Sequence, residues 1–241
     1  MLDGEAFFRA GCDYARHYAD HLLSLDTAYR QGGQTAREAL DSLGQDFDQI
    51  AHAQAWSAAH SARSAQARSL CSAFGRASPT LLEFQRLPET LIDWYSAALA
   101  ASESPSDAAR HHHSLGVVLM RLGSHAAAFT HHEAALRLAQ QSGAHECLVD
   151  ALIGMGDLHL LSGAFEQALA RLEAAWSAAE VQGYVAGMAG AALSMGNLYK
   201  GMNDFPRAEA AYDRSLKLHQ ASGDVVQTAI GLSLLGEVAY A

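Results

Sequence analysis

Histidine is the residue type whose number and spacing in this sequence offer the most obvious chemistry. The chain has 13 histidines, and five of them form two clusters, at residues 111–113 and 131–132. Two such clusters on neighbouring helices could bind zinc, because neutral imidazole is a common zinc ligand. However, no carboxylate or thiol completes a regular ligand set, and His132 aligns with Leu172 and Tyr212 of the repeat described below. We therefore expect packing histidines that make stability sensitive to pH, and we predict no metal and no cofactor.

The sequence contains none of the motifs that mark common enzyme active sites. It has no GxxxxGK[ST] phosphate loop, no GxGxxG that follows a strand, and no GxSxG, HExxH or paired-cysteine motif. The sequence therefore predicts no nucleotide-binding domain, and we predict that the chain is not an enzyme.

Composition restricts the partners and the compartment. The formal charge is -10, with 26 acidic against 16 basic residues, and no Lys/Arg run could follow a phosphate backbone, so direct contact with nucleic acid is not expected. Cys12, Cys71 and Cys147 are odd in number and far apart, which is typical of reduced, buried cysteines. Charged residues within the first nine positions interrupt any secretory signal. We expect a cytoplasmic protein.

A stretch without charged residues, 181–199, is nearly long enough to cross a bilayer. It contains four glycines as well as Gln182 and Asn197, and the corresponding part of the preceding repeat carries Asp150 and Asp157. We therefore interpret it as a repeat helix and predict no membrane span.

A constant interval of 40 residues is the strongest signal in the sequence. It separates four glycines, which are Gly116, Gly156, Gly196 and Gly236. A large apolar residue precedes each of them, and an alanine follows each of the first three after twelve residues. A second set with the same interval comprises Gly143, Gly183 and Gly223.

Each feature of the repeat predicts a part of a helix pair. A glycine on a helix face lets a second helix approach closely while the large residue beside it fills the gap. Gly123-Ser124, Gly163-Ala164 and Asn203-Asp204 are expected to separate the two helices of each unit, with Pro206 in a first turn. The second glycine set falls where the second helix should stop in a left-handed conformation.

These residues resemble the tetratricopeptide repeat family, whose signature is an apolar residue, Gly, an aromatic three residues later, and then Ala-x-x-x-aromatic. The best copy comprises Met195, Gly196, Tyr199, Ala208 and Tyr212. Other copies depart from the signature at Leu119, His159, His132 and Leu172; no unit has the closing proline, and the interval exceeds the family's usual ~34 residues. The resemblance is to the long-repeat variety. It implies an all-α fold, a right-handed α-solenoid of antiparallel helix pairs.

Upstream of the regular repeats we predict two further regions. Residues 79–106 are expected to form a degenerate first repeat, since the segment 94–99 parallels the segment 131–136. Residues 1–78 are expected to form an N-terminal helical region, with helices near 3–29 and 35–60 that Gly32 and Gly33 separate. Whether this region is a separate domain is left open.

Two further features indicate the kind of longer protein from which this chain could come. Phe47-x-x-Ile50 and Trp56 resemble the helical entry to the sensor regions of bacterial signal-transduction ATPases and transcriptional regulators. Residues 107–241 comprise the repeats, and the last unit stops at Tyr240-Ala241 without a capping helix. We therefore expect a piece of a longer regulatory protein.

The first helices of such a solenoid line its concave surface, and residues at i, i+4 and i+7 on one face should point into the groove. The predicted groove residues are His113, Val117, Met120, Ile153, Asp157, Leu160, Leu193, Asn197, Lys200, Ser233, Glu237 and Tyr240. Apolar walls with a few polar groups suit a protein or peptide segment, and the acidic residues favour a basic or neutral one. The alternative is a structural segment that self-associates through its exposed C-terminal repeat, where Leu235 and Tyr240 would matter most.

Overall fold

The structure of the protein is a computed structural model that describes residues 4–86 and 88–239. Within these ranges the regular structure is helical, and no strand occurs. In chain order the helices are α1 (Gly4–Arg30), α2 (Gly33–His60), α3 (Ala65–Phe74), α4 (Pro79–Leu82), α5 (Pro88–Ala100), α6 (Pro105–Arg121), α7 (His125–Ser142), α8 (His145–Leu161), α9 (Phe165–Gln182), α10 (Val185–Gly201), α11 (Phe205–Ser222) and α12 (Val225–Ala239).

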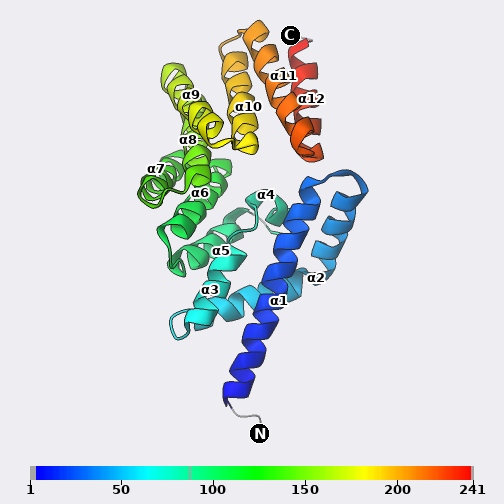
Figure 1. Cartoon of the computed structure of the whole chain (residues 1–241), viewed down its shortest axis with the longest axis vertical. Coiled ribbons are helices and arrows are strands. Elements are labelled where there is room, and N and C mark those ends of the chain that lie inside the picture. Colours follow the sequence, from blue (N-terminus) through cyan, green and yellow to red (C-terminus); the bar gives the residue numbers. More distant parts are fainter. Residues whose placement is uncertain (1–3, 87, 240–241) are drawn as a thin grey trace.

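The helices from α6 onward form antiparallel pairs, α6 with α7, α8 with α9 and α10 with α11, followed by α12 (Figure 1). The first helices α6, α8 and α10 also contact one another, so they form one continuous layer, and the second helices cover its other side. The predicted all-α solenoid of antiparallel helix pairs is confirmed.

The turns between helices lie where the sequence predicted them. Gly143, Gly183 and Gly223 follow the ends of α7, α9 and α11 with φ of 68°, 64° and 74°. In the turn between the two helices of a unit, the first two units have Gly123 and Gly163, both with φ 74°. The third unit has Asn203 at this position with φ 59°, because asparagine tolerates the left-handed region better than most residues. Pro206 lies in the first turn of α11, as expected.

A glycine of each first helix contacts a large side chain of its second helix, and we call these contacts the glycine seam. A Cβ added at Gly116 would overlap the ring of His132, one at Gly156 would overlap Leu172, and one at Gly196 would overlap Tyr212. All three of these side chains are buried. At Gly236 a Cβ would meet nothing within 4 Å, so the fourth glycine has no such partner among the described residues.

The N-terminal helices share one hydrophobic core with the start of the repeats. This core includes Phe47 and Ile50 of α2, Phe74 of α3, Tyr95 of α5 and Leu115 of α6. The buried Trp94 Nε1 donates to Phe74 O at 3.2 Å, and the Tyr95 hydroxyl donates to Ala77 O at 2.7 Å. The division into residues 1–78, 79–106 and 107–241 stays a prediction.

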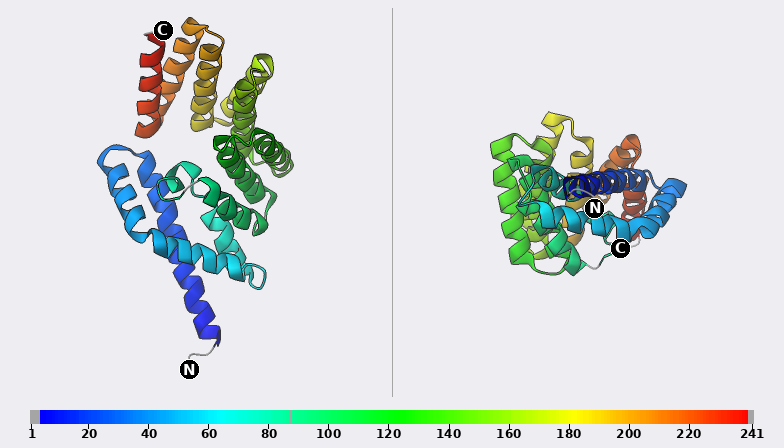
Figure 2. Two further views of the ribbon diagram at one scale, coloured as in Figure 1. Left: turned by 180° about the vertical axis from the view of Figure 1, so that it is seen from behind. Right: turned by 90° about the horizontal axis from the view of Figure 1, so that it is seen from below.

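The chain bends back on itself, so that its first and last helices meet. The tip of the α1–α2 hairpin lies beside the start of α12, as the views from front and behind both show (Figures 1 and 2). A Cβ added at Gly32 would overlap the side chain of Val225. The periodicity of the sequence gave no indication of this contact.

Two other expectations concern single elements. Cys12, Cys71 and Cys147 are free thiols and buried, as predicted. Among the described residues, none of the helices combines the length and the apolar character that crossing a bilayer would need, and this includes α10.

The glycine seam predicts opposite effects of one substitution at two equivalent positions. Gly196→Ala should destabilise the protein by about 1–3 kcal/mol, because the new Cβ collides with the ring of Tyr212, which is fully buried. Gly236→Ala should stabilise it by up to about 1 kcal/mol, because alanine favours the helix and the added methyl has space. Urea denaturation followed by circular dichroism measures both values. Equal effects at the two positions would contradict the seam.

Candidate functional site

The candidate site is a groove at the C-terminal ends of the first helices. A cavity of about 590 Å³ lies there between α6, α8 and α10. Its lining residues are Met120, Arg121, Asp157, Leu160, Leu161, Asn197, Lys200 and Gly201. Five of the predicted groove residues are among them, one from α6 and two each from α8 and α10. They come together because equal positions of successive repeats project from the same face of the solenoid.

Three polar groups give the groove its chemical character. Burial raises the pKa of Asp157 to about 6, although a hydrogen bond from the Ser194 hydroxyl lowers this pKa in part. The Tyr212 hydroxyl donates to Asn197 Oδ1 at 2.8 Å, which fixes the orientation of that carboxamide. Lys200 Nζ donates to Glu237 Oε2 at 3.0 Å, so its charge is largely neutralised. Arg121, the other cation of the lining, is paired with Glu83, so Asp157 leaves the groove slightly acidic at neutral pH.

The other predicted residues lie elsewhere. Ile153 and Leu193 pack into the apolar clusters between helices, Val117 is partly buried in α6, and His113 lines a different cavity. Ser233 and Glu237 are exposed on α12. Tyr240 lies outside the described residues.

The sequence reasoning did not name Arg121, Leu161 and Gly201, although they also line the groove. They follow Met120, Leu160 and Lys200 directly and share the 40-residue interval, so the repeat would have identified them. Arg121 is held by an ion pair with Glu83 and by Thr80 Oγ1 at 3.2 Å. These contacts tie the end of α6 to α4 and its neighbouring turn.

The clustered histidines are largely buried. His132 is fully buried, and neither ring nitrogen has a hydrogen-bond partner among the described residues. His112 Nδ1 and His131 Nδ1 lie 2.9 Å apart, and His111 Nε2 lies 3.1 Å from Ser72 O. No group of three or more metal-ligating side chains is found in the part of the chain that the structure describes. Burial lowers the pKa of His132 to about 3 and that of His111 to about 4.

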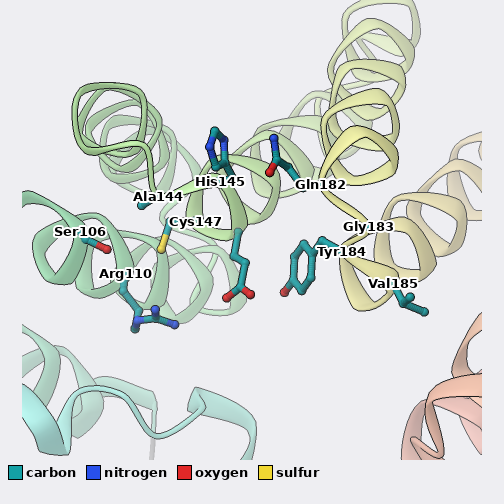
Figure 3. Close-up of a pocket in the computed structure, with 10 residues that line it drawn as sticks. Ser106, Arg110, Ala144, His145, Cys147, Gln182, Gly183, Tyr184 and Val185 are labelled. Atoms are coloured by element: carbon teal, nitrogen blue, oxygen red, sulfur yellow. The ribbon is translucent and has the colours of Figure 1, made fainter.

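A second cavity, of about 540 Å³, lies at the opposite ends of the first helices. Figure 3 shows Arg110 of α6 and Tyr184 at the start of α10 extending toward the same space on either side of α8. Cys147 of α8 lies between them, and His145 and Gln182 lie above these residues in the view. This cavity is more polar than the groove because charged side chains enter it.

Comparisons with known proteins support the repeat resemblance. Residues 107–180 match the family model of the tetratricopeptide repeat. No relative was found among curated proteins.

Several solved structures have a similar fold. A Rap protein complexed with competence and sporulation factor has a TM-score of 0.63 at 13% identity, over 94% of this chain and 71% of that one. BtubC (BKLC) from P. vanneervenii has a TM-score of 0.56 at 16% identity, over 92% and 82% of the two chains. The apo form of RapI has a TM-score of 0.55 at 12% identity, over 93% and 70%. At these identities the likeness establishes the fold alone.

Because His132 is buried, we predict that replacing it by leucine weakens the pH dependence of the free energy of unfolding. Its pKa lies below the ordinary 6.5 in the folded chain, so the unfolded chain binds more protons between about pH 3 and 6.5, and stability falls as pH drops through that window. At pH 5 this loss amounts to about 2 kcal/mol. His132→Leu, which introduces the side chain of Leu172, should remove it.

Urea denaturation at pH 7.5 and pH 5 measures the effect. Wild type should lose about 2 kcal/mol more than His132→Leu between the two pH values. His125→Leu at an exposed position is the matched control and should behave as wild type does. Equal losses for wild type and His132→Leu would contradict the interpretation.

Proposed function

The chain carries tetratricopeptide repeats in residues 107–180, and from this premise we propose that it is a non-catalytic scaffold that binds a protein or peptide segment in its groove. The proposal includes a cytoplasmic location and a role as the sensor or interaction module of a larger regulatory protein. The observation that carries it is the cavity between α6, α8 and α10, which Met120, Leu160 and Asn197 line together with Asp157.

The groove has the properties that an extended segment requires. Met120, Leu160 and Leu161 offer apolar contact area, and Leu161 is 57% exposed. The Asn197 carboxamide has both donor and acceptor capacity for a peptide main chain, and its orientation is fixed by Tyr212. An apolar groove with few, oriented polar groups is the usual form of a ligand site.

The charge of the groove determines which peptide segments it favours. Asp157 is partly buried and has a raised pKa, so a cation beside it would stabilise its ionised form. Lys200 is already paired with Glu237 and adds little positive charge. We therefore propose a segment in which a Lys or Arg follows or precedes an apolar residue. One protein of similar fold was solved as a complex, with competence and sporulation factor.

Peptide selection tests the groove. Short peptides selected from a displayed random library should bind the protein, and fluorescence anisotropy gives their dissociation constants. Leu160→Glu and Asn197→Ala should each weaken binding at least tenfold, because the first removes apolar contact area and the second removes the carboxamide that Tyr212 orients. Lys217→Ala, an exposed change on the second helix α11, is the control and should leave the affinity unchanged. Binding that survives both groove changes would refute the proposal.

The same peptides report on Asp157. Affinity for a basic peptide should fall as pH decreases through about 6, because protonation removes the charge that attracts it. Asp157→Asn should bind more weakly and lose this pH dependence.

A second candidate function is self-association through α12. Val225, Ile230 and Leu232 of this helix are 48%, 42% and 54% exposed. Leu152, the residue of α8 that is equivalent to Leu232, is only 7% exposed, because the neighbouring helices cover it. A second copy of the chain could bury this exposed apolar face of α12 against its own α12.

Sedimentation at several protein concentrations distinguishes this alternative. Under it, wild type forms a dimer or larger species, and Leu232→Glu becomes monomeric because a charge cannot be buried in an apolar contact without cost. Ser233→Glu, also on the exposed part of α12, is the control. A wild type that remains monomeric at every concentration rules out self-association.

A further inference from the structure

A charged cavity of about 380 Å³ lies inside the bend of the solenoid, separate from the groove. The tip of the α1–α2 hairpin, the turn before α4 and the N-terminal parts of α6, α8, α10 and α12 surround it (Figures 1 and 2). Charges of both signs line it. They are Arg30, Arg76, Arg110, Glu146, Asp150 and Asp224.

Three of these charges already have partners in the fold. Arg30 pairs with Asp26 at 3.2 Å, and Arg76 pairs with Asp107 at 3.5 Å. Asp224 Oδ1 accepts from the Gln227 backbone N–H at 3.0 Å and so caps α12. Of these contacts, only the Arg76–Asp107 pair joins two elements, the turn before α4 and α6, whereas the other two lie within α1 and at the start of α12.

The remaining charges are Arg110, Glu146 and Asp150. Among the described residues none of the three has an ion-pair partner within 4 Å, although Asp150 accepts weakly from the Tyr184 hydroxyl at 3.4 Å. Burial raises the pKa of the Asp150 carboxyl, and the charges of His113 and Arg110 oppose that rise. Arg110 therefore lies near enough to act on Asp150 through space without neutralising it.

Two buried polar atoms at the same cavity lack partners. His219 is 6% exposed, and its Nε2 has no hydrogen-bond partner among the described residues; the same is true of His113 Nδ1. Both residues line this cavity. Buried ring nitrogens without partners are uncommon in native proteins. Because His113 and His219 line this cavity, a molecule bound in it is one source of the missing hydrogen bonds.

The cavity of Figure 3 opens beside the same groups. Arg110, Glu146 and Tyr184 line both cavities, so a ligand that contacts them borders both spaces. The combined space suits a small molecule and excludes a folded partner.

We propose that this charged cavity binds a free α-amino acid, with its carboxylate on Arg110 and its ammonium group on Asp150 and Glu146. A lone anion would leave the two carboxylates without a counter-charge, and a lone cation would leave Arg110 without one. A molecule with both charges a few ångströms apart serves all three groups. His113 and His219 provide hydrogen bonds to its polar atoms. The charged cavity and the groove share no lining residue, and they lie toward opposite ends of the same helices.

Calorimetric titration of the intact chain with each of the common amino acids tests the proposal. At least one free amino acid should bind, and both its N-acetyl form, which lacks the ammonium charge, and its amide, which lacks the carboxylate, should bind at least tenfold more weakly. Absence of binding by every amino acid at about 10 mM would overturn the proposal. So would equal binding of the acetylated form or of the amide.

Variants locate the binding. Arg110→Met should weaken amino-acid binding at least tenfold, and Arg110→Lys should restore part of it. Arg63→Met, at an exposed position between α2 and α3, is the matched control. If Arg110→Met fails to fold by circular dichroism, Asp150→Asn provides the same test from the opposite charge.

A groove variant separates this site from the proposed function. Leu160→Glu should retain amino-acid binding while it loses the peptides, since Leu160 lines only the groove of these cavities. Simultaneous loss of both ligands in a folded Leu160→Glu protein would place them at one site and overturn the separate cavity.

Discussion

The contact of a glycine on each first helix with one large side chain of its second helix determines how close the two helices of a pair lie. The glycine lacks a Cβ, so His132, Leu172 or Tyr212 rests directly on the backbone of the opposite helix. Close-packed interiors leave little freedom once such a contact forms, because a shift along the helix would create overlap on one side and a void on the other. The seam thereby fixes the register within each pair, and the 40-residue interval repeats this register along the solenoid.

That register brings together residues that are distant in sequence. Met120, Leu160 and Lys200 are separated by 40 residues each, yet they line one cavity. In the third pair the seam contacts the groove directly, since the buried ring of Tyr212 covers Gly196 while its hydroxyl holds Asn197. The same side chain therefore packs the helices and orients a polar group at the candidate site.

The sequence was sufficient for features that depend on local or periodic contacts. The turns at Gly183 and Asn203 followed from backbone preferences, and the seam followed from the repeat. Five groove residues followed from equal positions in successive repeats. Ile153 and Leu193 lie closer to the middle of their helices, where neighbouring helices pack, and helical periodicity alone does not show how far along a helix a groove opens.

The contact of Gly32 with Val225 and the charged cavity could not be predicted in this way. The hairpin tip and α12 are almost 200 residues apart, and neither belongs to a repeating pattern with the other. Their meeting depends on the curvature that accumulates over all pairs between them. Small rotations per repeat add up along a solenoid, and no single residue type records their sum.

The arrangement of the two cavities follows from the shared helices. The groove is lined by the C-terminal ends of α6, α8 and α10, and the N-terminal halves of the same helices contribute Arg110, Asp150 and Tyr184 to the charged cavity. A helix transmits displacement along its length with little internal deformation, because its backbone hydrogen bonds run parallel to its axis. A change in the angle between neighbouring pairs would therefore alter the width of both cavities at once. The curvature of the solenoid is the quantity that the two sites have in common.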